Sequence, residues 1–144
     1  MREIKFRGIS IETGKFVYGY YVYKKEGDRH YIHEYVKGKE IDYTKEREVK
    51  GETVSQCTGL KDKNGKEIWE GDLINVSTRE ISHGRGYYYV TKSGVFEVYF
   101  SDSRAQFKYR RKGNNDSSEN FRFKESIYVE VIAQSPELLN NKDK

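Results

Sequence analysis

The sequence has one cysteine and one proline in 144 residues, and it has no long apolar run. The single thiol, Cys57, cannot form a disulfide within the chain, which is typical of proteins in a reducing compartment. No apolar stretch approaches the roughly 18–20 residues that span a bilayer. The opening residues, MREIKFRG, place no apolar stretch of signal-peptide length behind their charges. We therefore expect a cytoplasmic protein that has no membrane partner.

Apolar residues are also few, and aromatic residues supply much of what they lack. Hydrophobic residues make up 35% of the chain and charged residues another 35%, while aromatics reach 15% and include 13 tyrosines. Each aromatic side chain buries on the order of 150–250 Å², so a packed core is within reach. Disordered chains, by contrast, are poor in aromatic and β-branched residues. The net charge of +4 allows a nucleic-acid partner without requiring one.

Helix signals are scarce, and the pattern along the chain is that of strands. Short runs of aromatic and β-branched residues alternate with glycine turns, which predicts a mainly β, antiparallel fold. We predict an N-terminal β meander over residues 1–52 and a small SH3-like barrel over residues 53–139. One continuous domain over residues 1–139 is the alternative. Residues 135–137 resemble the start of a helix, so we expect one short C-terminal helical turn before a frayed tail at residues 140–144.

Residues 37–52 are almost wholly polar and mark the predicted boundary between the two parts. They form either an exposed loop or a weak, solvent-facing strand. They carry no apolar stripe that would dock a helix.

A compact motif occupies residues 56–74, and its spacing is that of sharp turns between strands. Asn64-Gly65 predicts a two-residue hairpin turn of type I′, since both residues tolerate positive φ. Gly59 and Gly71 allow the backbone conformations of further tight turns, and Asp62 and Asp72 can accept hydrogen bonds from backbone N–H groups in these turns. We expect Trp69 to be buried together with Leu60 and Ile68.

These residues resemble the signature of the YopX-like family of phage and prophage proteins, close to Q-x-T-G-L-x-D-x-N-G-x-x-I-x-E-G-D. Every fixed position is filled, and the segments at residues 2–7 and 14–20 also fit. At the C-terminal end, residues 131–139 depart from the Val-Ile-Gly-Asn segment of the family and look shortened, which leaves the packing of the tail open. The resemblance implies a mainly β, phage-encoded protein in a bacterial host cell, and it transfers no catalytic residues.

We interpret the motif as fold specification, with a binding site as the alternative. Its structural residues are Thr58, Gly59, Leu60, Asp62, Asn64, Gly65, Ile68, Glu70, Gly71 and Asp72.

The strongest binding candidate is a predicted hairpin with arms at about 105–112 and 120–124. Period-two geometry places the aromatic residues of both arms on one face and four cations on the other. These cations, Lys108, Arg110, Arg122 and Lys124, would form a compact basic patch suited to a phosphate backbone. The alternative is a hairpin whose outer cations are simply solvated.

Tyrosines cluster at residues 18–23 and 87–89. In a strand every second tyrosine is exposed. The exposed rings can stack on bases, form a protein interface or simply cover a small hydrophobic core.

Signals for catalysis and metal binding are weak. His30 and His33 lie three residues apart in a predicted strand and so face opposite sides, which does not suit a shared metal. Cys57 has no base and orienting group nearby in the sequence. A pair of carboxylates can be drawn from Glu67, Glu70 and Asp72, but acids are common in turns. The Gly84-x-Gly86 pattern is too short for a phosphate loop.

We therefore expect no enzyme, no metal and no cofactor. The sequence favours a non-catalytic binding module whose partner is nucleic acid or a host or phage protein. A self-associating structural protein is the alternative.

Overall fold

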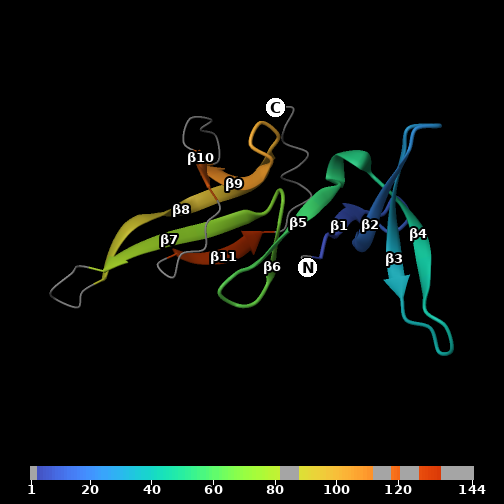
Figure 1. The fold of residues 1–144 in the computed structure, drawn as a ribbon, viewed down its shortest axis with the longest axis horizontal. Coiled ribbons are helices and arrows are strands. Elements are labelled where there is room, and N and C mark those ends of the chain that lie inside the picture. The colour runs from blue at the N-terminus through green and yellow to red at the C-terminus, as the bar shows by residue number, and fades with distance from the viewer. Residues whose placement is uncertain (1–2, 82–87, 112–117, 121–126, 134–144) are drawn as a thin grey trace. The chain divides into compact units, whose positions relative to one another are not determined.

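The computed structural model describes residues 3–81, 88–111, 118–120 and 127–133 (Figure 1). Nearly all of its regular structure is antiparallel β, which confirms the predicted fold class. The chain divides into two compact units, and the division falls between Gly59 and Leu60. Within the described ranges, no helix has the length and apolar character needed to cross a bilayer.

The first unit is built on a meander of strands. Its elements are β1 (Phe6–Ile9), β2 (Phe16–Lys24), β3 (Arg29–Val36), β4 (Tyr43–Val49), the 3-10 turn η1 (Gly51–Thr53) and β5 (Ser55–Lys61), whose last two residues belong to the second unit. Neighbours pair in the order β4-β3-β2-β1-β5, and every pairing is antiparallel. Strands β1 to β4 therefore form an antiparallel meander, and the assignment of residues 1–52 as a domain of their own stays a prediction.

The core of this unit follows from alternation along the strands. Val17, Ile32 and Val49 are buried on one face of the sheet. Gly8 belongs to the same layer, because a Cβ there would lie 2.9 Å from a methyl carbon of Val49. The absence of a side chain at this position lets β1 approach β4.

The same approach brings the end of β1 onto the end of β4. An isolated bridge joins Ser10 to Val49, the Lys50 amide donates to the Ile9 carbonyl at 2.9 Å, and the Ile11 amide donates to the Glu48 carbonyl at 3.0 Å. The contact does not continue as a ladder between named strands. The sheet is therefore bent until its first and fourth strands touch at one end.

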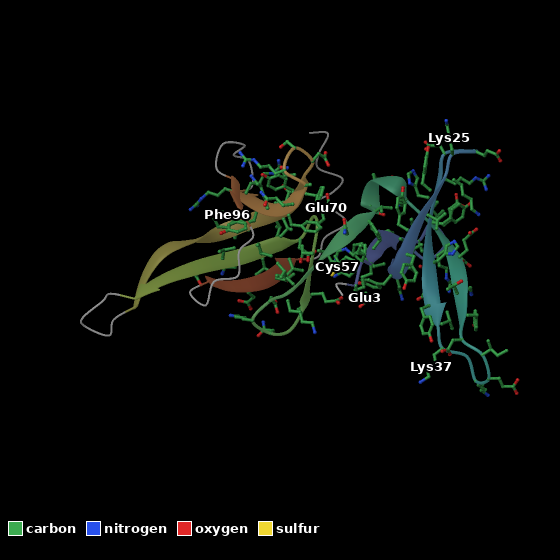
Figure 2. All side chains as sticks on the ribbon, viewed as in Figure 1. Glu3, Lys25, Lys37, Cys57, Glu70 and Phe96 are labelled. Carbon is green, nitrogen blue, oxygen red and sulfur yellow. The ribbon has the colours of Figure 1, made fainter. Side chains whose placement is uncertain are left out.

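The second unit contains a five-stranded sheet. Its elements are β6 (Glu67–Trp69), β7 (Leu73–Ile81), β8 (Tyr88–Ser101), β9 (Gln106–Arg111), β10 (Ser118–Asn120) and β11 (Ile127–Ala133). The sheet order is β10-β9-β8-β7-β11, and all four pairings are antiparallel. Its core contains Ile68, Ile74, Val76, Phe96, Val98, Tyr109 and Val131, and Phe96 on β8 is labelled in Figure 2.

Four finer predictions have different outcomes. Among the described residues the pairings do not close a barrel, so the SH3-like barrel stays a prediction. The C-terminal helical turn and the frayed tail fall outside the described residues. The polar segment at residues 37–52 contains β4, which settles the choice between a loop and a weak strand. The domain boundary at residue 52 stays a prediction; the division into compact units falls seven residues later.

Candidate functional site

The motif residues form the hairpin between β5 and β6. The Gly65 amide donates to the Asp62 carbonyl at 3.0 Å, and the Asp62 amide donates to the Lys66 carbonyl at 2.7 Å. Gly65 has φ of +79°, as predicted, but Asn64 is not among the residues with positive φ. The loop is thus a three-residue turn with Gly65 at its left-handed position, and the prediction of a two-residue type I′ turn is wrong. The side chain of Asp62 stabilises the three-residue turn through bonds to its backbone amides.

The Asp62 carboxylate holds this turn and also reaches another strand. Its Oδ1 accepts from the amides of Asn64 at 2.8 Å and Lys66 at 2.9 Å, and its Oδ2 accepts from the Val131 amide at 3.0 Å. Burial alone would raise the pKa of Asp62, but the three backbone donors outweigh it, so the pKa lies below its usual value. The carboxylate therefore fixes the hairpin against β11.

The second aspartate of the motif acts at the next turn. Asp72 is fully buried, and its Oδ2 accepts from the Trp69 amide at 2.9 Å. Its own amide donates to the Trp69 carbonyl, and its carbonyl accepts from the Val98 amide at 3.0 Å. Gly71, at φ +85°, turns the chain into this arrangement.

The apolar motif residues fill the interior. Ile68 and Trp69 are buried, with 0% and 1% of their surface exposed, and Leu60 packs against the core of the second unit. The predicted burial is confirmed for Ile68 and Trp69, whereas Leu60 is half-buried. Thr58 is also buried, and Glu70 is half-buried. The motif therefore has the contacts of a fold-specifying element, in line with the first of its two interpretations.

The predicted basic hairpin is present in its first arm. On β9, Tyr109 is buried at 3% exposure and Phe107 is half-buried, while Lys108 and Arg110 alternate with them and lie on the opposite face. The register with β8 places Lys108 opposite Tyr99 and Arg110 opposite Glu97. Two of the four predicted cations thus share one face of the sheet.

Arg110 has two partners on β8. Its guanidinium carbon lies 4.6 Å from the centre of the Tyr99 ring, and its Nη2 lies 3.5 Å from Oε2 of Glu97. The long N–O distance makes this a loose ion pair. The Arg110 guanidinium therefore lies over the Tyr99 ring, and Lys108 occupies the register position opposite the same tyrosine. We call Tyr99, Lys108 and Arg110 the β8–β9 basic face.

The second arm of the hairpin differs from the prediction. The strand that pairs with β9 is β10 at Ser118–Asn120, with Ser118 opposite Arg110 and Asn120 opposite Lys108. It begins before the predicted arm at 120–124. Arg122 and Lys124 lie outside the described residues, so their part of the basic patch stays a prediction.

The titratable groups considered for chemistry have structural contacts. Cys57 is buried at 3% exposure on β5. His30 and His33 take opposite faces of β3 as predicted: the Tyr21 hydroxyl lies 2.7 Å from Nδ1 of His30, and Glu46 lies 3.0 Å from Nε2 of His33. In the described part of the chain, no group of three or more histidine, cysteine, aspartate or glutamate side chains is placed to hold a metal ion.

The family comparison agrees with the motif. The model of the family described as YopX protein matches residues 5–140, which is nearly the whole chain. The chain belongs to the YopX protein family. This match confirms the resemblance drawn from residues 56–72.

Among solved structures, the chain is similar to the crystal structure of protein EF1440 from Enterococcus faecalis. The identity is 19% and the TM-score 0.48, over 96% of this chain and 99% of that one. No curated protein matches this chain.

Proposed function

We propose that this member of the YopX family is a non-catalytic module that binds nucleic acid through the β8–β9 basic face. The observation that carries the proposal is the stacking of Arg110 on Tyr99, with Lys108 at the register position opposite the same tyrosine. Arginine and lysine neutralise phosphates, and an arginine stacked on an aromatic ring offers a flat surface beside them. The family resemblance supports a phage or prophage origin and action in the bacterial cytoplasm.

The non-catalytic part of the proposal is supported by the contacts of the two motif aspartates and of the thiol. Asp62 binds three backbone amides and Asp72 binds the Trp69 amide, so both carboxylates serve the turns. The one thiol, Cys57, is buried. None of the three presents a free acid, base or nucleophile to a substrate.

The test is a salt series of binding followed by fluorescence anisotropy. Labelled single-stranded and duplex oligonucleotides are titrated with the wild type and with the double variant Lys108→Gln/Arg110→Gln. Loss of two phosphate contacts should flatten the log–log salt slope by about 1.8 on duplex DNA or about 1.4 on a single strand.

The matched control removes two charges from elsewhere on the same hairpin. Arg104 lies exposed in the turn between β8 and β9, and Arg111 lies on the opposite face, 5.2 Å from the centre of the Phe96 ring. Arg104→Gln/Arg111→Gln should change the slope much less than Lys108→Gln/Arg110→Gln. An equal effect of the two pairs would show that total charge, and not this face, governs binding.

A further inference from the structure

A second surface, in the first unit, carries a row of aromatic side chains on one sheet face. On β2, Val17 and Tyr21 point into the core, so the alternate residues Tyr18 and Tyr20 point to the other face. Tyr18 and Tyr20 on that face are 43% and 61% exposed. This surface of β2 is therefore aromatic.

The register extends this row across to β3. Tyr20 lies opposite His33, so residues at even spacing from His33 share its face, and Tyr35 is 60% exposed there. The Tyr18, Tyr20 and Tyr35 rings thus belong to one face of two neighbouring strands. We call them the tyrosine face.

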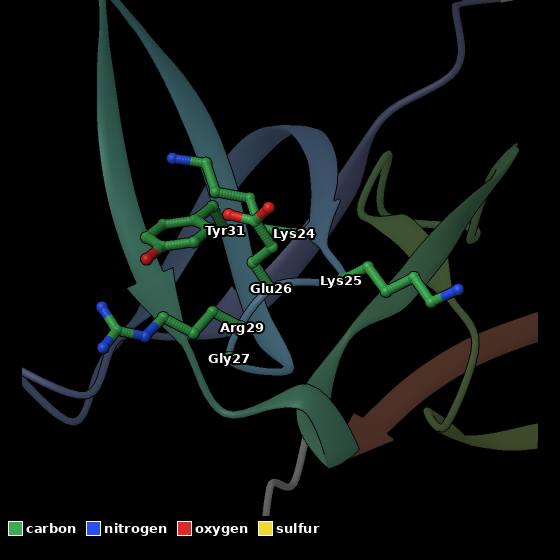
Figure 3. A pocket seen from close by; sticks show the side chains of 6 residues that line it. All are labelled: Lys24, Lys25, Glu26, Gly27, Arg29 and Tyr31. Carbon is green, nitrogen blue, oxygen red and sulfur yellow. The ribbon is translucent and has the colours of Figure 1, made fainter.

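At the hairpin end of these strands, the same face holds a basic recess. A recess of about 510 Å³ is lined by Lys24, Lys25, Glu26, Gly27, Arg29 and Tyr31 (Figure 3). The register places Lys24 opposite Arg29 and Val22 opposite Tyr31, on the side of Tyr20.

Within the recess, the cations are arranged around one aromatic ring. The Lys24 ammonium lies 4.3 Å from the centre of the Tyr31 ring, and Arg29 extends beside that ring, whereas Lys25 points away from it (Figure 3). Three cations and one carboxylate line the recess, so it favours an anion.

One carboxylate outside the recess already contacts a cation in it. Glu46 on β4 accepts from Lys24 at 2.9 Å, and this hydrogen bond is the main reason why the pKa of Glu46 lies below its usual value. Both side chains are open to solvent, at 47% and 40% exposure. Exposed ion pairs of this kind contribute little, so an incoming phosphate can take over the ammonium.

From this juxtaposition we infer that the first unit binds an unpaired stretch of nucleic acid, with bases stacked on the tyrosine face and a phosphate in the recess at Lys24 and Arg29. Every base offers a π face, so such stacking tolerates any sequence, and the flanking cations hold the backbone. Paired bases cannot reach the rings, so the surface selects single strands over duplex. Glu46 and Glu48 of β4 lie on the same face as the tyrosines, so the exposed rings, with Lys24 and Arg29 at their end, and not a net positive charge, favour this occupant over an apolar protein surface.

The experiment compares two double variants, each of which removes two exposed tyrosines. Tyr20→Ala/Tyr35→Ala removes two rings of the tyrosine face. The control, Tyr23→Ala/Tyr43→Ala, removes two rings that are 48% and 54% exposed and lie on the opposite face of the same strands. The probe is a labelled oligothymidine, titrated by anisotropy at fixed salt, and thermal unfolding checks that each variant is folded.

Each lost stack should weaken binding roughly 5- to 150-fold, so Tyr20→Ala/Tyr35→Ala should weaken it at least about 25-fold. The control should stay within a few-fold of the wild type. A Lys24→Gln/Arg29→Gln variant should also weaken binding and should flatten its salt dependence.

Three results would overturn the inference. Unchanged binding by Tyr20→Ala/Tyr35→Ala, with binding lost in Lys108→Gln/Arg110→Gln, would remove this site and leave the β8–β9 basic face standing. No binding of oligothymidine by the folded wild type at low salt would overturn the inference, and the proposed function would then rest on duplex binding alone. Loss of self-association in Tyr20→Ala/Tyr35→Ala, seen by light scattering without a change in oligothymidine binding, would make the face a contact between copies.

Discussion

At the scale of single residues, the Asp62 carboxylate connects two parts of the chain that lie 69 residues apart. Asn64 and Lys66 belong to its own turn, whereas Val131 belongs to β11. A local turn residue therefore also sets how the hairpin meets the sheet of the second unit. This dual use explains why an acid stands at this position of the motif.

The first prediction concerns the pH dependence of Asp62. Its pKa is lower in the folded chain than the ordinary value of 3.8, so the unfolded chain binds the proton more readily. The resulting stability is fully present above the unfolded pKa and is lost as pH falls through the depressed folded value. Urea unfolding of the wild type should show this loss below about pH 4, where the unfolded carboxyl begins to take up its proton.

The matched variant for that experiment is Asp62→Asn, which keeps the shape and removes the titration. The asparagine side chain has one oxygen in place of two, so it cannot accept from the turn amides and from the Val131 amide together. One buried donor is left unsatisfied, at a cost of about 1–3 kcal/mol at neutral pH. The difference in stability from the wild type should shrink as the pH falls. A difference that stays constant from pH 7 to pH 3 would contradict the role given to the carboxylate.

The second prediction concerns Gly65. A Cβ at this position would meet nothing within 4 Å, so only the backbone conformation, φ +79°, opposes a side chain. Gly65→Val should lower the free energy of unfolding by on the order of 1 kcal/mol or more, because β-branched residues resist positive φ. Gly65→Asn should cost less, since asparagine tolerates this region. Equal thermal stability of the two variants would argue against the assigned turn.

The sequence predicted the residues of this turn better than its type. Asn64-Gly65 is a signal for a two-residue loop, and Gly65 indeed has positive φ. The Asp62 carboxylate accepts from the turn amides of Asn64 and Lys66 and also from Val131 on β11, and only this last, long-range bond leaves no trace in local spacing.

At the scale of elements, β4 is an edge strand with an unusual distribution of charge. Glu46 and Glu48 alternate with Lys45 and Arg47, so each face of the strand carries one sign. In a two-fold antiparallel pair, opposed residues come from the same face of the two copies. Acids would then meet acids and bases would meet bases. This arrangement opposes self-pairing through β4.

The third prediction follows from that arrangement. Replacing Lys45, Glu46 and Arg47 with threonine should leave an edge of high β propensity whose one remaining charge is Glu48, and should increase self-association relative to the wild type. Light scattering across a concentration series measures it. The control, Lys45→Arg/Glu46→Asp/Arg47→Lys, keeps every sign and should behave as the wild type does. If the threonine variant associates no more than this control, the charges do not protect the edge.

The same strand shows why sequence patterns could not choose between a loop and a strand at residues 37–52. Most side chains of β4 are exposed, so no period-two apolar signal marks it. Only its ladder with β3 and the bridge between Ser10 and Val49 define it. Likewise, alternation located β9 correctly but could not locate β10, because pairing with β9 depends on the turn between them.

At the scale of the whole molecule, the two proposed surfaces differ in physical character. The β8–β9 basic face acts through charge, and the tyrosine face acts mainly through stacking. The fourth prediction is that their variants change different features of one salt series on oligothymidine. Lys108→Gln/Arg110→Gln should flatten the slope by about 1.4, since each phosphate contact on a single strand contributes about 0.7. Tyr20→Ala/Tyr35→Ala should lower the affinity at every salt concentration and leave the slope nearly unchanged.

The division between charge and stacking would be contradicted if both variants lowered the affinity without changing the salt slope, or if both flattened the slope. Comparison of oligothymidine with duplex DNA also measures the selectivity for single strands. Binding of duplex DNA should be weakened by Lys108→Gln/Arg110→Gln and should hardly change in Tyr20→Ala/Tyr35→Ala.

The burial of Cys57 gives this chain a built-in kinetic probe. It is the only thiol in the chain, its side chain is 3% exposed, and its amide donates to the Lys5 carbonyl beside β1 (Figure 2). A maleimide can reach it only when β5 separates from its surroundings, so the labelling rate reports the free energy of that opening. A ligand that binds the closed first unit should slow labelling in proportion to its occupancy, which makes the unaltered protein its own binding assay.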